Sequence, residues 1–461
     1  MKSCLAAASL LALVLPSTAE VDRLIPRLMS DGEVPGLSIV LIRDSRIAWH
    51  HAYGLANAET GEPLTDRTVF EAASLTKPVF AYAVLKLADA GRLSLDAPLG
   101  PLPEDRLTDE RARRITARMV LEHTTGFQNE VLPGQTLRIH FAPGERFSYS
   151  GAGFLYLQRF VERTTGKALP VLMDELVFRP LGMRDSGYVW LPEYERLEAF
   201  GHNAAGAAVP RRMPREPTVA TLHTTPLDYA RFMIAAMKGT GLRRDTARAM
   251  LTSQVAIDEG CFTCLDGGTG RVSESLSWGL GWGLERTARG TAFWHWGDNN
   301  GEFHNFAMGY VDGDGVVVFT NSGNGHSIMP EIIDAALGGP HPAFAWMGYD
   351  SYKSPARQLL RDILARGPVA LEGASAASLP ESRINAIGYV LLQKKRLPEA
   401  IAAFERNVRR FPESWNAYDS LGEAYAAAGD REKAIAAYQR SLDLNPQNAN
   451  AAAMLKTLRG R

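Results

Sequence analysis

Apolar stretches at two widely separated places along the chain predict β-strands. Between residues 36 and 53, two apolar runs flank a short polar break, a pattern that predicts a β-hairpin. Much later, apolar runs predict strands over residues 279–284, 303–310 and 316–321, the last two joined by an Asp- and Gly-rich turn at 312–315. Both regions are therefore expected to contribute strands to a sheet.

Apolar residues at helical spacing predict helices between these strands. One helix follows Ser74 and is expected to end at Gly91, with Pro78 tolerated in its first turn. Another helix is expected over residues 154–163. Strands from both ends with helices between them predict one antiparallel sheet with a helical insertion, which is an α+β fold.

The last part of the chain repeats itself with a period of 34 residues, the period of tetratricopeptide repeats. The corresponding pairs are Ile387-Gly388 and Leu421-Gly422, Ala400 and Ala434, Phe404 and Tyr438, and Pro412 and Pro446. Small residues at such positions let paired helices approach closely. The tail therefore resembles the tetratricopeptide-repeat family and is expected to be all-α, with a generic helical-hairpin repeat as the alternative.

These patterns divide the chain into four parts. Residues 1–19 contain a basic residue, an apolar run and small residues, as a signal peptide does, and the run is too short to span a bilayer. Residues 20–337 are expected to form the α+β domain, 338–378 a linker with one helix, and 379–461 the repeat domain. We therefore expect an exported protein, periplasmic or secreted, without a membrane span.

Composition narrows the classes of function. The chain has 461 residues, of which 46% are hydrophobic and 22% charged, as in soluble globular proteins. Its net charge of −1 gives no electrostatic reason to expect nucleic acid or an anionic membrane as a partner. The sequence contains no phosphate-binding glycine loop, no H-E-x-x-H motif and no four-ligand Cys/His cluster. We therefore expect no cofactor and no metal.

Removal of the predicted signal peptide, with Cys4, leaves two cysteines, Cys261 and Cys264. In an oxidising compartment such a closely spaced pair is expected to form a disulfide. A thioredoxin-like redox pair and two free thiols are the alternatives.

Ser74-Leu75-Thr76-Lys77 is the leading candidate for chemistry. A serine hydroxyl is a weak nucleophile and needs a nearby base. Residues at i and i+3 share a helix face, about 5–6 Å apart, so Lys77 can reach Ser74. The S-x-x-K arrangement carries acyl transfer in β-lactamases and penicillin-binding proteins. A capping serine beside a solvated lysine is the alternative for the tetrapeptide alone.

Two further segments add candidates. Tyr149 is expected on an exposed loop, where a neighbouring cation would lower its pKa from the ordinary value of about 10 and let it carry the serine proton. His295 lies in a glycine-rich strand segment whose backbone N–H groups can stabilise an oxyanion opposite the N–H of Ser74. A half-buried tyrosine at a helix start and a structural histidine are the alternatives.

Taken in order, these motifs resemble those of the serine β-lactamase family of class C type, which also holds D,D-peptidases, D-aminopeptidases and carboxylesterases. The matching stretches are residues 34–36, 70–78, 93–98, 121–127, 147–151, 179–183 and 295–297. The resemblance implies that Ser74 is the nucleophile and that Lys77 and Tyr149 are its coupled base. It also implies an oxyanion hole made by the N–H groups of Ser74 and Asp298, and a structural role for His123.

Two departures from the family pattern concern substrate recognition. Gly151 replaces the asparagine of the Tyr-x-Asn motif, and His295-Trp296-Gly297 replaces Lys-Thr-Gly, whose lysine attracts the substrate carboxylate. A histidine is mostly neutral at pH 7 and attracts a carboxylate less. We expect Gly151, His295, Gly297 and Asp298 to bind substrate, and recognition of β-lactams to be weak.

The sequence thus predicts an exported, metal-independent serine hydrolase that forms an acyl-enzyme on Ser74. Its substrate is expected to be an ester or a small amide or peptide. A true β-lactamase or D,D-peptidase is one alternative. A non-catalytic scaffold that binds a protein or peptide through the tetratricopeptide repeats is another.

Overall fold

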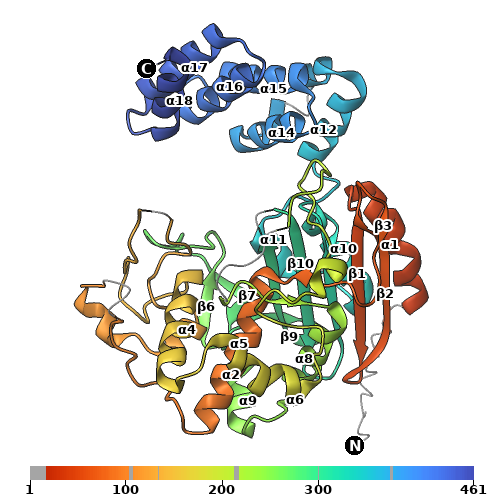
Figure 1. Cartoon of the computed structure of the whole chain (residues 1–461), viewed down its shortest axis with the longest axis vertical. Helices are drawn as coiled ribbons and strands as arrows, with labels where there is room; N and C mark the ends of the chain where they lie inside the picture. Colours follow the sequence, from red (N-terminus) through yellow and green to blue (C-terminus); the bar gives the residue numbers. More distant parts are fainter. Residues whose placement is uncertain are drawn as a thin grey trace, which may run out of the picture. The chain divides into compact units, whose positions relative to one another are not determined.

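The computed structural model describes residues 17–102, 107–132, 134–211, 218–299, 301–373 and 377–460. Most of the predicted signal peptide, including Cys4, lies outside these residues. The chain groups into two compact units, one reaching to Gly201 and continuing over Ala208–Tyr349, the other comprising His202–Ala207 and the chain from Asp350 onward. Figure 1 shows the elements of both units.

The first unit is built on a large antiparallel sheet. Among the described residues, nine strands lie in the order β3-β2-β1-β11-β10-β9-β8-β7-β6. They are β1 (Gly36–Arg43), β2 (Arg46–Asn57), β3 (Glu62–Pro63), β6 (Val255–Asp258), β7 (Val272–Trp278), β8 (Gly283–Thr287), β9 (Gly290–Asn299), β10 (Phe303–Tyr310) and β11 (Gly315–Thr320). A separate ribbon pairs β4 (Phe70–Glu71) with β5 (His223–Thr224). The pairing of β1 with β11 confirms the prediction that both sequence regions build one sheet.

Strand β1 is buried on both faces of the sheet. Val40 pairs with Val317 and, with Ile42, belongs to the large hydrophobic core of this unit. Ile39 and Leu41 point to the opposite face, because side chains alternate along a strand, and they are also fully buried. Both faces of the sheet centre are therefore covered, which explains the nearly continuous apolar run.

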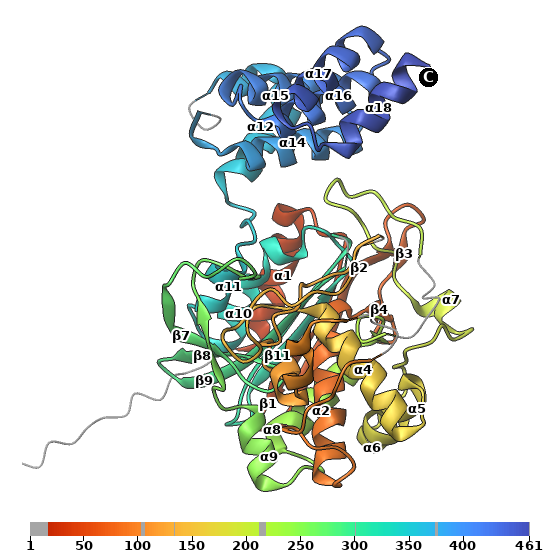
Figure 2. The same cartoon turned by 90° about the vertical axis from the view of Figure 1, so that its left-hand side faces the viewer.

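Helices cover the two faces. The α-helices of the first unit are α1 (Thr18–Gly32), α2 (Thr76–Asp89), α3 (Ala117–Leu121), α4 (Gly151–Thr165), α5 (Leu169–Met173), α6 (Arg179–Leu181), α7 (Tyr194–Leu197), α8 (Pro226–Lys238), α9 (Arg244–Met250), α10 (Met329–Leu337) and α11 (Pro342–Met347). Three segments are 3₁₀-helical, η1 (Ala73–Leu75), η3 (Glu110–Arg114) and η5 (Gly325–Ser327), and one is π-helical, η4 (Asp174–Phe178). Helices α1 and α10 pack on one face, against β1 and β11, and α8 packs on the other (Figure 2). None of the described helices is long and apolar enough to cross a membrane.

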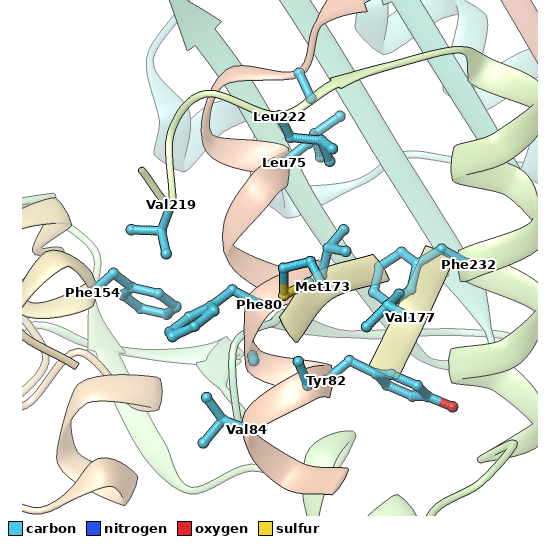
Figure 3. Close-up of a cluster of buried hydrophobic side chains, with 14 of the residues drawn as sticks. Leu75, Phe80, Tyr82, Val84, Phe154, Met173, Val177, Val219, Leu222 and Phe232 are labelled. Atoms are coloured by element: carbon cyan, nitrogen blue, oxygen red, sulfur yellow. The ribbon is translucent and has the colours of Figure 1, made fainter. Parts of the chain in front are cut away.

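The core beside α2 holds the predicted nucleophile segment in place. Leu75 of η1 and Phe80 of α2 meet Phe154 of α4 and Phe232 of α8 in this core (Figure 3). Each of these side chains is almost completely buried. Helix α2 follows Ser74 and stops just before Gly91, as predicted, and α4 contains the predicted helix 154–163.

The predicted strand over residues 279–284 is wrong in its first part. Strand β7 ends at Trp278 and β8 begins at Gly283, with a tight bend between them. In the bend, the N–H of Gly281 donates to Leu121 O at 2.9 Å instead of joining the ladder. Gly281 has a φ of +88°, and a Cβ there would lie 2.5 Å from Ala81 Cβ. An apolar run with glycines here forms a buried turn because it packs against α2.

The second unit is helical. It contains α12 (Pro355–Arg366), η6 (Pro368–Glu372), α14 (Glu381–Gln393), α15 (Leu397–Arg410), α16 (Trp415–Ala427), α17 (Arg431–Leu444) and α18 (Ala449–Arg459). A Cβ on Gly388 would lie 2.5 Å from the ring of Phe404, and one on Gly422 would lie 2.9 Å from the ring of Tyr438. Close helix packing at glycines 34 residues apart is what the repeat pattern predicts.

Candidate active site

Ser74 lies in a short turn, η1, that leads directly into α2. The preceding residue, Ala73, has a φ of 51°, a left-handed conformation that residues with a side chain seldom adopt. A buried tyrosine fixes this turn, because the hydroxyl of Tyr229 donates a hydrogen bond of 3.0 Å to Leu75 O. Strained positions of this kind persist where the surrounding structure fixes them, and they cluster at functional sites.

Lys77 points back along the helix to Ser74, with 2.8 Å between its Nζ and the Ser74 Oγ. Its side chain is almost completely buried, with a relative exposure of 4%. Burial lowers the pKa of Lys77 from 10.5 to about 7, and the charge of Glu130 opposes this shift. A large share of the amines is therefore neutral at pH 7 and can accept a proton from the serine.

Tyr149 comes close to this pair from the start of α4. Its ring stacks between His123 and Phe262, at centroid distances of 4.3 and 4.5 Å. The Nζ of Lys77 lies 5.2 Å from the Tyr149 ring centroid. The structure therefore brings together the three residues that the sequence assigned to the catalytic core.

Two expectations about Tyr149 are wrong. Its relative exposure is 2%, so it is buried and does not lie on an exposed loop. Burial raises the pKa of Tyr149 well above 10, and the nearby Ser74 hydroxyl acts in the opposite direction. Among the described groups, the Tyr149 hydroxyl nevertheless has no hydrogen-bond partner of good geometry. The effect of burial thus outweighs that of the Ser74 hydroxyl, and Tyr149 carries its proton in the free protein.

His123 has the structural role that the sequence implied. Its Nδ1 accepts a hydrogen bond of 3.0 Å from the N–H of Ser150, the residue that caps α4. Its carbonyl oxygen accepts another, of 2.8 Å, from Ser148. Burial lowers the pKa of His123 well below its usual range, and the charge of Lys77 acts in the same direction. His123 is therefore a neutral support for the Tyr149 ring.

Strand β9 runs beside the serine turn. Gly297 packs so closely that a Cβ there would lie 2.4 Å from Ala72 O. Strand β10, which pairs with β9, also fixes the segment before Ser74, because Asn305 Nδ2 donates a hydrogen bond of 2.9 Å to Glu71 O. Only a glycine lets β9 pack this closely against the chain at Ala72. This packing, and not direct contact with substrate, explains the glycine at position 297. The next residue, Asp298, borders the space in front of Ser74.

His295 does not occupy a position suited to substrate binding. Its side chain is completely buried beneath the site and lines neither of the cavities at Ser74. Nδ1 lies 2.8 Å from Trp296 O, and burial lowers the pKa of His295 to about 3. The sequence could not reveal this burial, because alternation along a strand does not tell which face is covered.

Two cavities meet at Ser74. The first, of about 320 Å³, we call the helix-side cavity; it is lined by Ala73, Ser74, Lys77, Asn129, Glu130, Val131, Gly151, Ala152, Leu155, Thr218, Val219, Ala220, Asp298 and Asn299. The second, of about 430 Å³, we call the aromatic cavity; it is lined by Ser74, Asn129, Glu130, Tyr149, Phe262, Trp296, Asp298, Met347 and Tyr349. Both volumes suit a small organic substrate.

Several lining residues were missed by the sequence reasoning. Asn129 and Glu130 border both cavities, and Asn129 Oδ1 accepts a hydrogen bond of 2.9 Å from the N–H of Gly151. An amide therefore lies beside the position where the family motif would place its asparagine. The only available signal was their location, directly after the family stretch 121–127.

Asp298 lies at the exposed end of a polar network that also contains two buried histidines. Its carboxylate accepts a hydrogen bond of 2.9 Å from the Tyr349 hydroxyl and lies 3.5 Å from His304 Nε2. His326 stacks on His304 at 4.2 Å and places its Nε2 3.0 Å from Gly297 O. Although burial acts in the opposite direction, the two histidines and Tyr349 hold the pKa of Asp298 well below its usual range. Asp298 is therefore an anion.

A second charged cluster lies behind the serine turn. Ligand atoms of Glu71, Glu198 and His223 lie within 4.8 Å of one another, an arrangement that could hold a metal ion. However, Glu198 Oε1 lies 2.9 Å from His223 Nε2. Burial lowers the pKa of His223, but the hydrogen bond and charge of Glu198 outweigh it and raise the pKa overall. An ion pair accounts for this cluster, and the expectation of a metal-independent site stays a prediction.

Near the site, Cys261 and Cys264 form a disulfide, with their Cα atoms 5.6 Å apart. The bond closes a short loop that carries Phe262. The carbonyl oxygen of Phe262 accepts a hydrogen bond of 3.1 Å from the N–H of Tyr149. The cysteines thus support one wall of the aromatic cavity.

Comparison with known proteins identifies the families to which the two parts of the chain are similar. The profile of the Beta-lactamase family matches residues 21–337, and a Tetratricopeptide repeat profile matches residues 385–449. Esterase EstB from Burkholderia gladioli is 34% identical over 42% of this chain and 57% of its own length. Penicillin-binding protein 4 from Amycolatopsis lactamdurans is 28% identical over 68% of this chain and 87% of its own length. The chain thus spans little more than half of the esterase.

Solved structures show the same fold. The octameric penicillin-binding protein homologue from Pyrococcus abyssi has a TM-score of 0.57 at 21% identity, covering 75% of this chain and 82% of that one. Since the first profile covers well over half of the residues, the chain belongs to the β-lactamase family of serine hydrolases and carries a C-terminal tetratricopeptide-repeat region.

Proposed function

We propose that this protein hydrolyses an ester or a small amide or peptide through an acyl-enzyme on Ser74. The observation that carries the proposal is the 2.8 Å separation between Ser74 Oγ and the buried Nζ of Lys77. Because burial brings the pKa of Lys77 to about 7, a neutral amine lies within hydrogen-bonding distance of the nucleophile.

The residues divide the proton transfers between them. Lys77 accepts the proton of Ser74 as Oγ bonds to the substrate carbonyl carbon. The N–H groups of Ser74 and Asp298 stabilise the oxyanion that forms. When the carbon–oxygen or carbon–nitrogen bond breaks, the Tyr149 hydroxyl gives its proton to the leaving group, and the Lys77 ammonium returns one to Tyr149. Water then releases the acyl group by the reverse sequence of proton transfers.

A fluorophosphonate probe tests the nucleophile. The wild-type protein is expected to be labelled, and Ser74→Ala is expected to lose labelling, whereas Ser253→Ala, a change at an exposed serine outside both cavities, should keep it. Equal labelling of wild type and Ser74→Ala would overturn the proposal. A panel of p-nitrophenyl esters, D-amino-acid p-nitroanilides and nitrocefin then separates esterase, aminopeptidase and β-lactamase activity.

We also propose that the protein is exported and that its repeat region binds a protein or peptide. The apolar N-terminal segment supports export, and the family match over residues 385–449 supports partner binding. Mass spectrometry of the N-terminus of the mature protein tests the first proposal, since an intact Met1 in a periplasmic or culture fraction would contradict cleavage. A pull-down with full-length Ser74→Ala as bait tests the second.

A further inference from the structure

We propose that the aromatic cavity binds a positively charged ammonium group of the substrate, so that the preferred substrates are esters or amides that carry a quaternary or protonated amine. This inference rests on the proposed function, because it concerns what the acyl-enzyme site accepts. The evidence is the combination of aromatic rings and carboxylates in the wall of one cavity that opens at Ser74.

The first observation is the set of rings. Tyr149, Phe262 and Trp296 border the cavity with centroid distances of 4.5 Å between Tyr149 and Phe262, 5.1 Å between Tyr149 and Trp296, and 5.3 Å between Phe262 and Trp296. The rings of Phe262 and Trp296 meet at an interplanar angle of 66°. Tyr349 adds a fourth ring. Tyr149 stacks on Phe262 at an interplanar angle of 28° and on His123 on its other side, so its two faces are covered. Phe262, Trp296 and Tyr349 are therefore the lining rings that can attract a cation, because the faces of aromatic rings are negative.

The second observation is the charge of the wall. Of the described residues that line the aromatic cavity, Glu130 and Asp298 carry carboxyl groups, and none is a lysine, arginine or histidine. His304 stands behind Asp298, 3.5 Å from the carboxylate, and does not line the cavity. Lys77 borders only the helix-side cavity and is partly neutral at pH 7. A substrate carboxylate would meet two carboxyl groups here, whereas a cation would be attracted by both.

The third observation is position. Ser74 borders the aromatic cavity, so a group held there lies next to the atom that attacks the substrate. The hydroxyl of Tyr349 binds the Asp298 carboxylate at 2.9 Å and fixes it at the wall. A volume of about 430 Å³ accommodates a trimethylammonium group with a short linker.

A matched pair of thioesters tests the proposal. Acetylthiocholine and 3,3-dimethylbutyl thioacetate have nearly the same shape and differ in the positive charge, and release of thiol is measured for both. We expect kcat/KM for the cationic ester to exceed that for the neutral ester by about tenfold or more. An equal or smaller value for the cationic ester, in a protein that fluorophosphonate labels at Ser74, would overturn the inference and leave the hydrolase intact.

Variants locate the effect. Glu130→Gln and Tyr349→Leu should each lower the cationic-to-neutral ratio by about threefold or more, since each removes one attraction for the cation. Glu274→Gln removes a carboxylate that lies outside both cavities and should leave the ratio unchanged. A ratio that is insensitive to Glu130→Gln and Tyr349→Leu would contradict the assigned place.

A measurement without turnover keeps the inference testable. Tetramethylammonium chloride should slow fluorophosphonate labelling of Ser74 more than an equal concentration of sodium chloride does. If labelling is absent altogether, the proposed hydrolase function fails and this inference fails with it. If labelling occurs at the same rate in both salts, only the ammonium site fails.

Discussion

Acylation of Ser74 should follow the titration of Lys77. With a pKa of about 7, the amine is ~50% neutral at pH 7, ~10% neutral at pH 6 and ~90% neutral at pH 8. Only the neutral amine can accept the serine proton. The acylation rate should therefore fall about fivefold between pH 7 and pH 6 and about tenfold for each further pH unit below that, and it should level off above about pH 8. With the ordinary pKa of 10.5, the rate would keep rising well beyond pH 9.

The rate of fluorophosphonate labelling between pH 5 and pH 9 measures this profile directly. The two histidines nearest the site do not interfere, because burial lowers the pKa of His295 to about 3 and that of His123 well below its usual range. Glu122 titrates in the same range, since burial raises its pKa to about 7. It lines neither cavity, so the Glu122→Gln variant should keep the midpoint.

A matched pair of lysine variants completes the test. Lys77→Met should lower the labelling rate by several orders of magnitude at every pH, because the base is gone. Lys86 lies on the same helix, is partly buried, and donates to Leu176 O at 2.7 Å away from the site. Lys86→Met should therefore keep both rate and midpoint. A wild-type midpoint above pH 9, or a flat profile, would refute the assignment of Lys77 as the base.

Three further predictions test other parts of the structure. Tyr149→Phe should slow acylation and deacylation at least a hundredfold with an unchanged melting temperature, since the lost hydroxyl has no well-formed hydrogen bond in the free protein; unchanged kinetics would exclude its role. Because the pKa of His223 is raised above 6.5, its ion pair with Glu198 stabilises the fold fully below pH 6.5 and is lost as pH rises through the raised value. His223→Gln should thus lower the melting temperature more at pH 6 than at pH 9, and an equal loss would contradict the ion pair. Gly422→Val should destabilise the repeat region by about 2 kcal/mol or more, because the new side chain would clash with the ring of Tyr438; calorimetry of the full chain measures this, with the exposed Gly429→Ala as a milder comparison.

Local sequence rules predicted the parts of the site that depend on spacing. Ser74 and Lys77 are one helical turn apart, so their contact follows from helix geometry alone. Gly388 and Gly422 were likewise found from a fixed period. The family pattern added Tyr149, which no local rule links to Ser74.

Other parts of the site depend on tertiary packing and could not be predicted. Tyr349 lies far from Ser74 in sequence, and it reaches the cavity because the chain after α11 passes beside β9. The pKa of Tyr149 is raised, whereas the sequence analysis predicted that it is lowered, because the burial of this side chain could not be read from the sequence. The apolar run 279–284 was ambiguous for a related reason, since buried turns and buried strands share a composition.

The pairing of β1 with β11 also has a consequence for folding while the chain is being synthesised. During synthesis, Ser74 and Lys77 emerge from the ribosome long before Gly315–Thr320, the strand that lies between β1 and β10. Until that strand arrives, β1 and β10 each expose an unpaired apolar edge that invites association with other chains. A polypeptide truncated before Gly315 would therefore carry the complete S-x-x-K motif and the Tyr149 segment yet lack the centre of its sheet.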